Sequence, residues 1–454
     1  MAEFAASVGA VALLISSGFG AARAADPGPG RILYRGATLI DGTGAPARPG
    51  MAILTDGERI ERVAPAAELA APPDAKVVDV SGLYVIPGLI NSHEHLATPP
   101  NRRFAEAMMR RDLYGGITAV RDMADDLRAV ADLARASRIG EISGPDIYFA
   151  ALMAGPEFFD DPRTHAATAG ETAGAVPWMQ AIAPDTDLVL AVAMARGTGA
   201  TAIKIYADLP GDQVAAITKE AHRQGIQVWA HAAVFPASPQ QVIEAGADAV
   251  SHVCMLAYQA SDAMPRAYHH RAAVDEARFQ GGDSPVVGRL FDQMRARGTV
   301  LDATLLVYRQ MAEAHAAHPD TPAPYCSEAL AERLAGQAYR DGLLISAGTD
   351  GFSPQPDPWP ALQDEMELLQ DKAGMKPADV IRSATLVGAI SLHKQAQMGT
   401  IEPGKLANLV FVAKDPSVDV RAFRSVVLTV KRGADFWRKD YRPVTRDEMG
   451  PDEE

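Results

Sequence analysis

The sequence contains few cysteines. Among its 454 residues there are only two, Cys254 and Cys326. Two are too few for the disulfide framework of a small secreted domain, and a lone pair neither shows nor excludes an oxidising compartment. We expect both to be small, buried apolar side chains.

Basic residues are also in deficit. Lys and Arg total 43 against 57 Asp and Glu, which gives a net charge of −14. A phosphate-rich partner would be repelled by this charge, so we expect no nucleic-acid partner. Tandem repeats and low-complexity tracts are absent as well. With 48% hydrophobic residues, the chain is long enough for one large globular domain and a smaller one.

The sequence lacks an apolar run of the roughly 20 residues that a transmembrane helix needs. Its N-terminus instead carries a shorter apolar core, Val8 to Ile15, followed by Ala22-Arg23-Ala24. This order is typical of a signal peptide with an A-x-A cleavage site, although the usual basic segment before the core is missing. We expect residues 1–25 to direct export to the periplasm or the medium; without such a signal the protein would be cytoplasmic.

Both ends of the chain are rich in short β-type runs. Near the N-terminus these are residues 32–34, 37–40, 52–54 and 76–80, separated by Asp-Gly and Pro-rich turns, and the same texture returns at 407–412 and 425–430. The pattern predicts one small β-sandwich domain assembled from residues 26–86 and 396–454.

The middle of the chain alternates strands with helices. Helical patterns include residues 212–224, 236–244, 359–370 and 376–383. Eight alternating strands over about 300 residues favour a (β/α)8 TIM barrel, whose active site lies at the carboxyl ends of the strands. We assign the barrel to residues 87–395 and place its strands near 85–92, 117–122, 146–152, 202–206, 227–231, 249–253, 300–306 and 343–348.

Several of these strands end in metal-ligand residue types. His93 and His95 end the first strand, and because side chains alternate across a strand, both imidazoles point to the same place. His231, His252 and Asp350 follow the fifth, sixth and eighth strands. The His-x-His pair alone could be a polar strand end, and each of the others a satisfied barrel histidine or a helix-capping Asp. Together they predict a divalent-metal site at one mouth of the barrel.

Lys204 lies within the fourth strand, with Tyr206 on the same face. It would point into the barrel, where an unpaired ammonium is costly. Two solutions are open: a salt bridge with a carboxylate, or reaction with carbon dioxide to give an anionic carbamate that bridges metals.

These residues carry a resemblance to a known family. The chain resembles the amidohydrolase superfamily, in particular its imidazolonepropionase-like and Xaa-Pro-dipeptidase-like branch. The resemblance rests on residues 87–95 (PGLINSHEH), 116–122 (GITAVRD), Lys204, His231, His252, 347–350 (AGTD) and 399–410 (GTIEPGKLANLV).

The resemblance implies the barrel and β-sandwich fold and two divalent metal ions, most often Zn²⁺, with Mn²⁺, Fe²⁺ or Co²⁺ as alternatives. It implies that His93, His95 and Asp350 hold one ion, that His231 and His252 hold the other, and that a carboxylated Lys204 bridges them. Some relatives hold one metal and no carbamate. Two positions depart from the family pattern, Asn91 and Asn408, and both are expected either to contact the ligand residues or to be structural.

The implied chemistry is hydrolysis by an activated water. Paired metal ions lower the pKa of a bridging water towards about 7, and Asp350 is the expected general base and then acid. Tyr206 and His165 are the candidate donors to the oxyanion, with a core aromatic and an exposed histidine as the alternatives. Tyr308 and Arg309 could hold a substrate carboxylate, although a surface pair is the favoured interpretation.

The sequence therefore predicts a metal-dependent amidohydrolase that cleaves an amide bond in a dipeptide, N-acyl amino acid or similar carboxylate-bearing amide. A cyclic amide, lactone or ester is the alternative substrate, and a catalytically silent assembly subunit is the alternative class. A silent relative should have lost one or more of the six metal-ligand residues. This sequence has all six, which disfavours the silent subunit. Whether the chain forms a homo-oligomer is left open.

Overall fold

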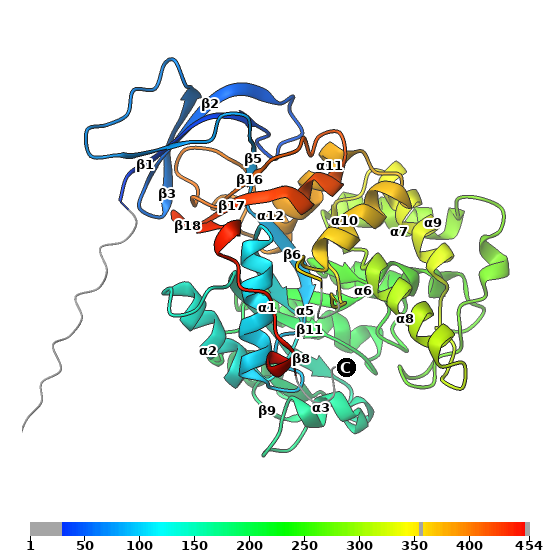
Figure 1. Ribbon diagram of the computed structural model, residues 1–454. Coiled ribbons are helices and arrows are strands. Elements are labelled where there is room, and N and C mark those ends of the chain that lie inside the picture. The colour runs from blue at the N-terminus through cyan, green and yellow to red at the C-terminus, as the bar shows by residue number, and fades with distance from the viewer. Residues whose placement is uncertain (1–29, 354–356, 450–454) are drawn as a thin grey trace, which may run out of the picture.

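The protein is described by a computed structural model, in which residues 30–353 and 357–449 are placed (Figure 1). The predicted signal segment, residues 1–25, lies outside the described residues. Within the described part, no helix is both long enough and apolar enough to cross a lipid bilayer.

The larger unit is a (β/α)8 barrel. Its eight strands run in chain order and pair in parallel, each with the next. The first and last strands meet where the Ser92 amide donates to the Ala347 carbonyl at 2.9 Å. The strands are β6 (Leu89–Glu94), β7 (Ile117–Asp122), β8 (Asp146–Ala154), β11 (Ala202–Ile205), β12 (Gln227–His231), β13 (Ala249–Ser251), β14 (Val300–Asp302) and β15 (Ile345–Ser346).

Helices cover the outside of the barrel. They are α1 (Arg102–Tyr114), α2 (Leu127–Arg138), α4 (Leu188–Gly197), α5 (Gly211–Arg223), α6 (Pro239–Ala245), α7 (Pro285–Arg297), α8 (Leu305–Ala317), α9 (Glu328–Arg340), α10 (Leu362–Asp371), α11 (Pro377–Arg382) and α12 (Gly388–Ser391). After β8 the chain makes an excursion through the short helix α3 (Pro162–Ala166) and the strands β9 (Ala175–Val176) and β10 (Met179–Ala181), of which β10 pairs with β8.

The smaller unit is a mostly antiparallel sheet built from both chain ends, as the sequence predicts. Its centre is the pairing of β5 with β16, which brings blue N-terminal and orange to red C-terminal strands together in Figure 1. Its apolar side chains form a buried cluster of their own. The strands are β1 (Ile32–Leu39), β2 (Arg48–Asp56), β3 (Arg59–Pro65), β4 (Lys76–Asp79), β5 (Tyr84–Pro87), β16 (Leu409–Val412), β17 (Val426–Lys431) and β18 (Ala434–Trp437).

The seventh barrel strand is shorter than predicted. We expected residues 300–306, but β14 ends at Asp302 and α8 begins at Leu305. The change of direction occurs at Thr304, whose φ of +51° is left-handed and incompatible with a strand. The polar residue at the true strand end is therefore Asp302.

The two cysteines are bonded to each other. Both are buried, as expected. Our interpretation of them as free apolar side chains is wrong, because Cys254 and Cys326 form a disulfide with a Cα–Cα distance of 6.3 Å. The bond links the segment after β13 to the loop between α8 and α9, which are 72 residues apart in the sequence. Sequence spacing carries no signal for such a pairing.

Candidate metal centre

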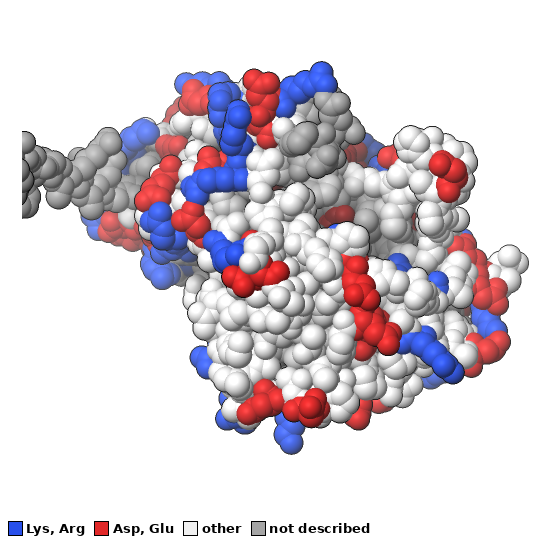
Figure 2. Space-filling model, turned by 90° about the horizontal axis from the view of Figure 1, so that it is seen from below, with Lys and Arg blue, Asp and Glu red and all other residues white. Residues whose placement is uncertain are grey.

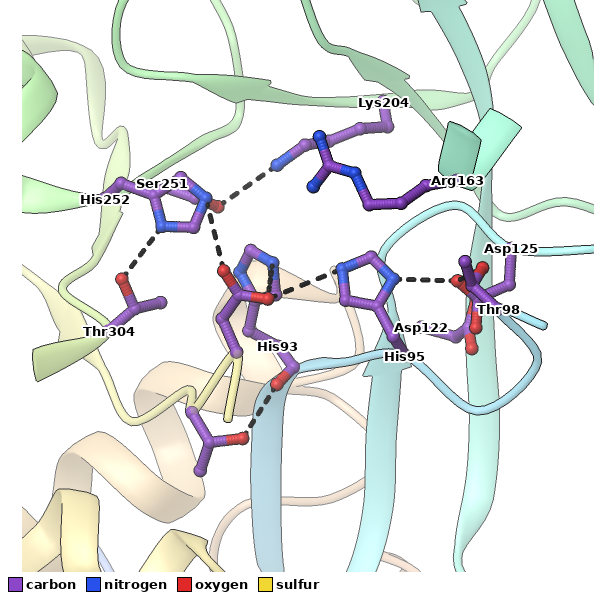
Figure 3. A network of polar contacts seen from close by, with 12 residues as sticks. His93, His95, Thr98, Asp122, Asp125, Arg163, Lys204, Ser251, His252 and Thr304 are labelled. Carbon is purple, nitrogen blue, oxygen red and sulfur yellow. Dashed lines mark hydrogen bonds and ion pairs between the residues drawn. The ribbon is translucent and has the colours of Figure 1, made fainter. Parts of the chain in front are cut away.

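Three histidine rings converge at the carboxyl end of the barrel (Figure 3). Each is held through its Nδ1 atom: His93 by Asp302 at 2.7 Å, His95 by Asp125 at 2.7 Å and His252 by the Thr304 hydroxyl at 2.9 Å. Because an acceptor on Nδ1 fixes the ring and its tautomer, the Nε2 atoms are left to bind a ligand.

The three Nε2 atoms surround the carboxylate of Asp350. They lie 3.6 Å (His93), 3.5 Å (His95) and 3.7 Å (His252) from its oxygens. A tetrahedral zinc ion with ligand bonds of about 2.0–2.2 Å keeps its ligands about 3.3–3.6 Å apart. Donor atoms of His93, His252 and Asp350 also all lie within 4.8 Å of one another. The donor types and spacing fit a divalent metal ion.

The backbone is strained at this centre. His252, Thr304 and Asp350 have φ values of +72°, +51° and +45°, a region that residues other than glycine rarely adopt. Strain of this kind persists only where the surroundings enforce it, and it clusters at functional sites. Here it turns the side chains of three adjoining strand ends into one space.

Lys204 is fully buried beneath the histidines, within a network centred on Asp302. The Asp302 Oδ2 atom accepts from His93 Nδ1, from the Ser251 hydroxyl at 3.2 Å and from Arg121 at 3.3 Å. Lys204 Nζ lies 3.5 Å from the same hydroxyl, which is the contact drawn in Figure 3. Burial lowers the pKa of Lys204 to about 7 even though Asp302 and Asp350 oppose the change.

Burial also keeps most of the imidazoles neutral. It lowers the pKa of His93, His231 and His252 well below the usual value, and the charge of Lys204 adds to the effect. For His95, burial acts in the same direction but the Asp125 carboxylate outweighs it, so that its pKa is raised. Neutral imidazole is the form that binds metal.

His231 adjoins these three histidines through His252. Its ring is 4.9 Å from that of His252 and 4.0 Å from that of Tyr206, measured between centroids. Its Nδ1 atom is buried and finds no hydrogen-bond partner among the described residues. All six predicted ligand positions are thus brought together at one end of the barrel.

A cavity of about 320 Å³ opens above the histidines. Besides the histidines and Asp350, its wall includes aromatic and sulfur-containing side chains and two arginines: Phe158, Tyr206, Tyr268, Tyr325, Phe352, Met179, Met255, Met311, Arg163 and Arg271. A volume of this size suits a small molecule. On the face seen in Figure 2, described residues of both charge signs are interspersed around a largely uncharged centre.

The two candidate oxyanion donors are placed differently. Tyr206 lines the cavity, where its hydroxyl accepts from Arg163 at 3.2 Å and its ring stacks on Phe158 at 4.5 Å. His165 is exposed on α3 and does not line the cavity, because α3 turns Arg163 and Thr164 inward instead. His165 therefore has no part in the function proposed below.

The pair suggested for a substrate carboxylate lies elsewhere. Tyr308 is fully buried, so the interpretation as a surface pair is wrong for it. Its hydroxyl is hydrogen-bonded to that of Tyr325 and accepts from the Cys254 amide. Arg309 pairs with Glu328 at 3.2 Å. Neither of them lines the cavity.

Asn91 and Asn408 have structural contacts, as expected. Asn91 donates to Glu94 at 2.6 Å and to the Thr349 hydroxyl at 3.1 Å, and its Oδ1 accepts from the His93 amide. Asn408 accepts from the Arg432 amide in the terminal sheet. The contacts of Asn91 tie the first and last barrel strands together beside the metal centre.

The family assignment follows from these features and from comparison with known proteins. Residues 84–434 match the model of the amidohydrolase family, so the chain belongs to this family. It is a metal-dependent hydrolase that acts on carbon–nitrogen bonds.

Individual relatives are distant. The chain is 23% identical over 418 residues to the 5-methylthioadenosine/S-adenosylhomocysteine deaminase of Symbiobacterium thermophilum, covering 84% of this chain and 85% of that protein. It is 27% identical over 374 residues to the imidazolonepropionase of Cutibacterium acnes, covering 80% and 83%. A solved Xaa-Pro dipeptidase with bound methionine in its active site superposes with a TM-score of 0.71 at 21% identity, covering 90% of this chain and all of that one, which shows a shared fold.

Proposed function

We propose that the protein hydrolyses the amide bond of a small carboxylate-bearing molecule, such as a dipeptide or an N-acyl amino acid. The observation that carries this proposal is the ring of Nε2 atoms around Asp350 at the floor of a cavity sized for one small molecule.

In this proposal the chain holds two divalent metal ions, most often zinc. His93, His95 and Asp350 would hold one, and His231 and His252 would hold the other. The fully buried Lys204 amine would add to carbon dioxide and lose a proton, and the resulting anionic carbamate would supply a further ligand. When bound, such ions polarise the substrate carbonyl and lower the pKa of water to about 7.

The residues of the chain then position the groups and move the protons. Asp350 takes a proton from the attacking water and passes it to the leaving nitrogen as the carbon–nitrogen bond breaks. Tyr206, whose hydroxyl accepts from Arg163, is the proposed donor to the oxyanion. Burial raises the pKa of Tyr206, so the phenol stays protonated.

The test is hydrolysis of a mixed library by the metal-replete protein. The library contains dipeptides, N-acyl amino acids, lactams and lactones, and turnover is followed by mass spectrometry. We expect cleavage confined to open-chain amides that carry a carboxylate. Cleavage of lactams or lactones alone would contradict the proposal.

We also propose that the protein is exported. The Cys254–Cys326 disulfide supports this proposal, because disulfides persist in oxidising compartments and are rare in the cytosol. N-terminal sequencing of the protein from culture medium or periplasm should find a start close behind Ala24, and an intact N-terminus in the cytosolic fraction would contradict it.

A further inference from the structure

Arg271 lies in the cavity wall, on the long segment between β13 and α7. Its guanidinium carbon is 4.0 Å from the centroid of the Tyr268 ring and 4.5 Å from that of Tyr325. Stacking on aromatic faces holds the planar cation in place without using its N–H groups. The edge of the guanidinium is therefore left for hydrogen bonding.

Arg271 has no acidic partner. Among the described residues, no carboxylate lies within ion-pair distance of it. Its Nη1 donates to the Tyr268 carbonyl at 2.6 Å. Its buried Nε has no hydrogen-bond partner among the described residues. Arg163, the other arginine in the wall, is paired with Asp161 at 2.6 Å. A partly buried, unpaired cation is costly, and an anionic ligand would remove that cost.

The wall connects Arg271 to the metal centre through a single ring. Tyr268 stacks on His231 at 5.7 Å and also contacts the guanidinium of Arg271. Among the described residues that line the cavity, the only carboxylate is that of Asp350, which lies at the metal centre. A carboxylate held at Arg271 and an amide above His231 therefore fit within one small molecule.

The segments that form this wall are fixed to each other. The Val274 amide donates to the Tyr325 carbonyl at 2.8 Å, and the next residue, Cys326, is bonded to Cys254. The Tyr308 hydroxyl adds a hydrogen bond to that of Tyr325 at 2.9 Å. A wall held in this way is already organised before a ligand binds, which lowers the cost of binding.

We propose that Arg271 is the specificity-determining residue of the site: it binds the carboxylate of an N-acyl amino acid whose apolar side chain packs against the aromatic and methionine side chains of the cavity. The inference deepens the proposed function and rests on it. Guanidinium and carboxylate match as paired donors and acceptors, and a hydrogen-bonded contact to a charged group changes affinity by about 10- to 150-fold.

The test measures binding without turnover. Asp350→Asn protein is titrated by calorimetry with racemic N-acetylphenylalanine and, separately, with N-acetylphenylalaninamide, in which a neutral amide replaces the carboxylate. We expect the acid to bind at least tenfold more tightly than the amide. Adding Arg271→Met should abolish this preference, whereas Arg271→Lys, which keeps the charge, should retain part of it.

Arg278→Met is the matched control, because Arg278 belongs to the same segment, pairs with Asp262 and Asp275 and does not line the cavity. It should leave the preference unchanged. Circular dichroism and thermal melting check that each variant is folded. Equal binding of acid and amide, a preference that survives Arg271→Met, or binding of neither ligand overturns the inference. If the library experiment finds no hydrolysis but the acid still binds through Arg271, the proposed reaction fails while the binding site stands.

Discussion

Replacing Asp350 with asparagine should lower kcat on any substrate found in the library by about 10²–10⁴-fold, the usual contribution of a general acid–base group. The amide of asparagine has nearly the same shape as the carboxylate but cannot accept the proton of the attacking water. Asparagine also tolerates the left-handed backbone at this position, where φ is +45°, so the fold should be retained.

The measurement is kcat over a pH series together with metal content by elemental analysis. We expect the variant to keep much of its metal, because the three histidines remain in place. The control is Asp292→Asn, at an exposed aspartate on α7 that pairs only with Arg295 on the same helix. Equal turnover by the Asp350 variant and the wild-type protein would show that another group moves the proton.

Replacing Asp302 with alanine should lower the free energy of unfolding of the metal-free protein by about 3–5 kcal/mol. The Asp302 carboxylate is fully buried and faces the fully buried guanidinium of Arg121 and the Lys204 amine. Burial raises the pKa of Asp302 to about 6, so it is mostly ionised at pH 7 and offsets the charge of Arg121. Its removal leaves Arg121 buried without a counter-ion.

Urea unfolding followed by circular dichroism measures this loss. The double variant Asp302→Ala, Arg121→Met should recover part of the stability, because the orphaned cation is removed as well. Metal affinity should also fall by about 10- to 100-fold, since His93 loses the acceptor on its Nδ1 atom. A stability change of less than about 1 kcal/mol would show that Asp302 does not balance the buried charges.

Much of the architecture could be predicted from the sequence because its signals are local. Strand and helix alternation placed all eight barrel strands. The rule that ligands sit at strand ends pointed to His231, His252 and Asp350, whose side chains line one cavity. The helix expected over residues 236–244 begins at Pro239 instead, because the Ser238 side chain caps it. The same rule would have pointed to Asp302 if we had ended the seventh strand at that residue rather than at residue 306.

The remaining site residues gave no usable signal because their roles depend on contacts between distant segments. Asp125 and Thr304 each hold a histidine through one hydrogen bond and belong to no motif. Arg271 lies in an insertion whose path is set by contacts with Tyr325 and by the disulfide. Such contacts join residues tens of positions apart, which hydrophobic periodicity does not report.

The pairing of β5 with β16 has a consequence for the order in which the protein is made. At 5–20 residues per second, a ribosome needs roughly half a minute to pass from the first of these strands to the second. During that time the N-terminal strands exist without their C-terminal partner, and their apolar faces are open to wrong associations. The sheet of the smaller unit is therefore completed only after residues 409–412 have been made.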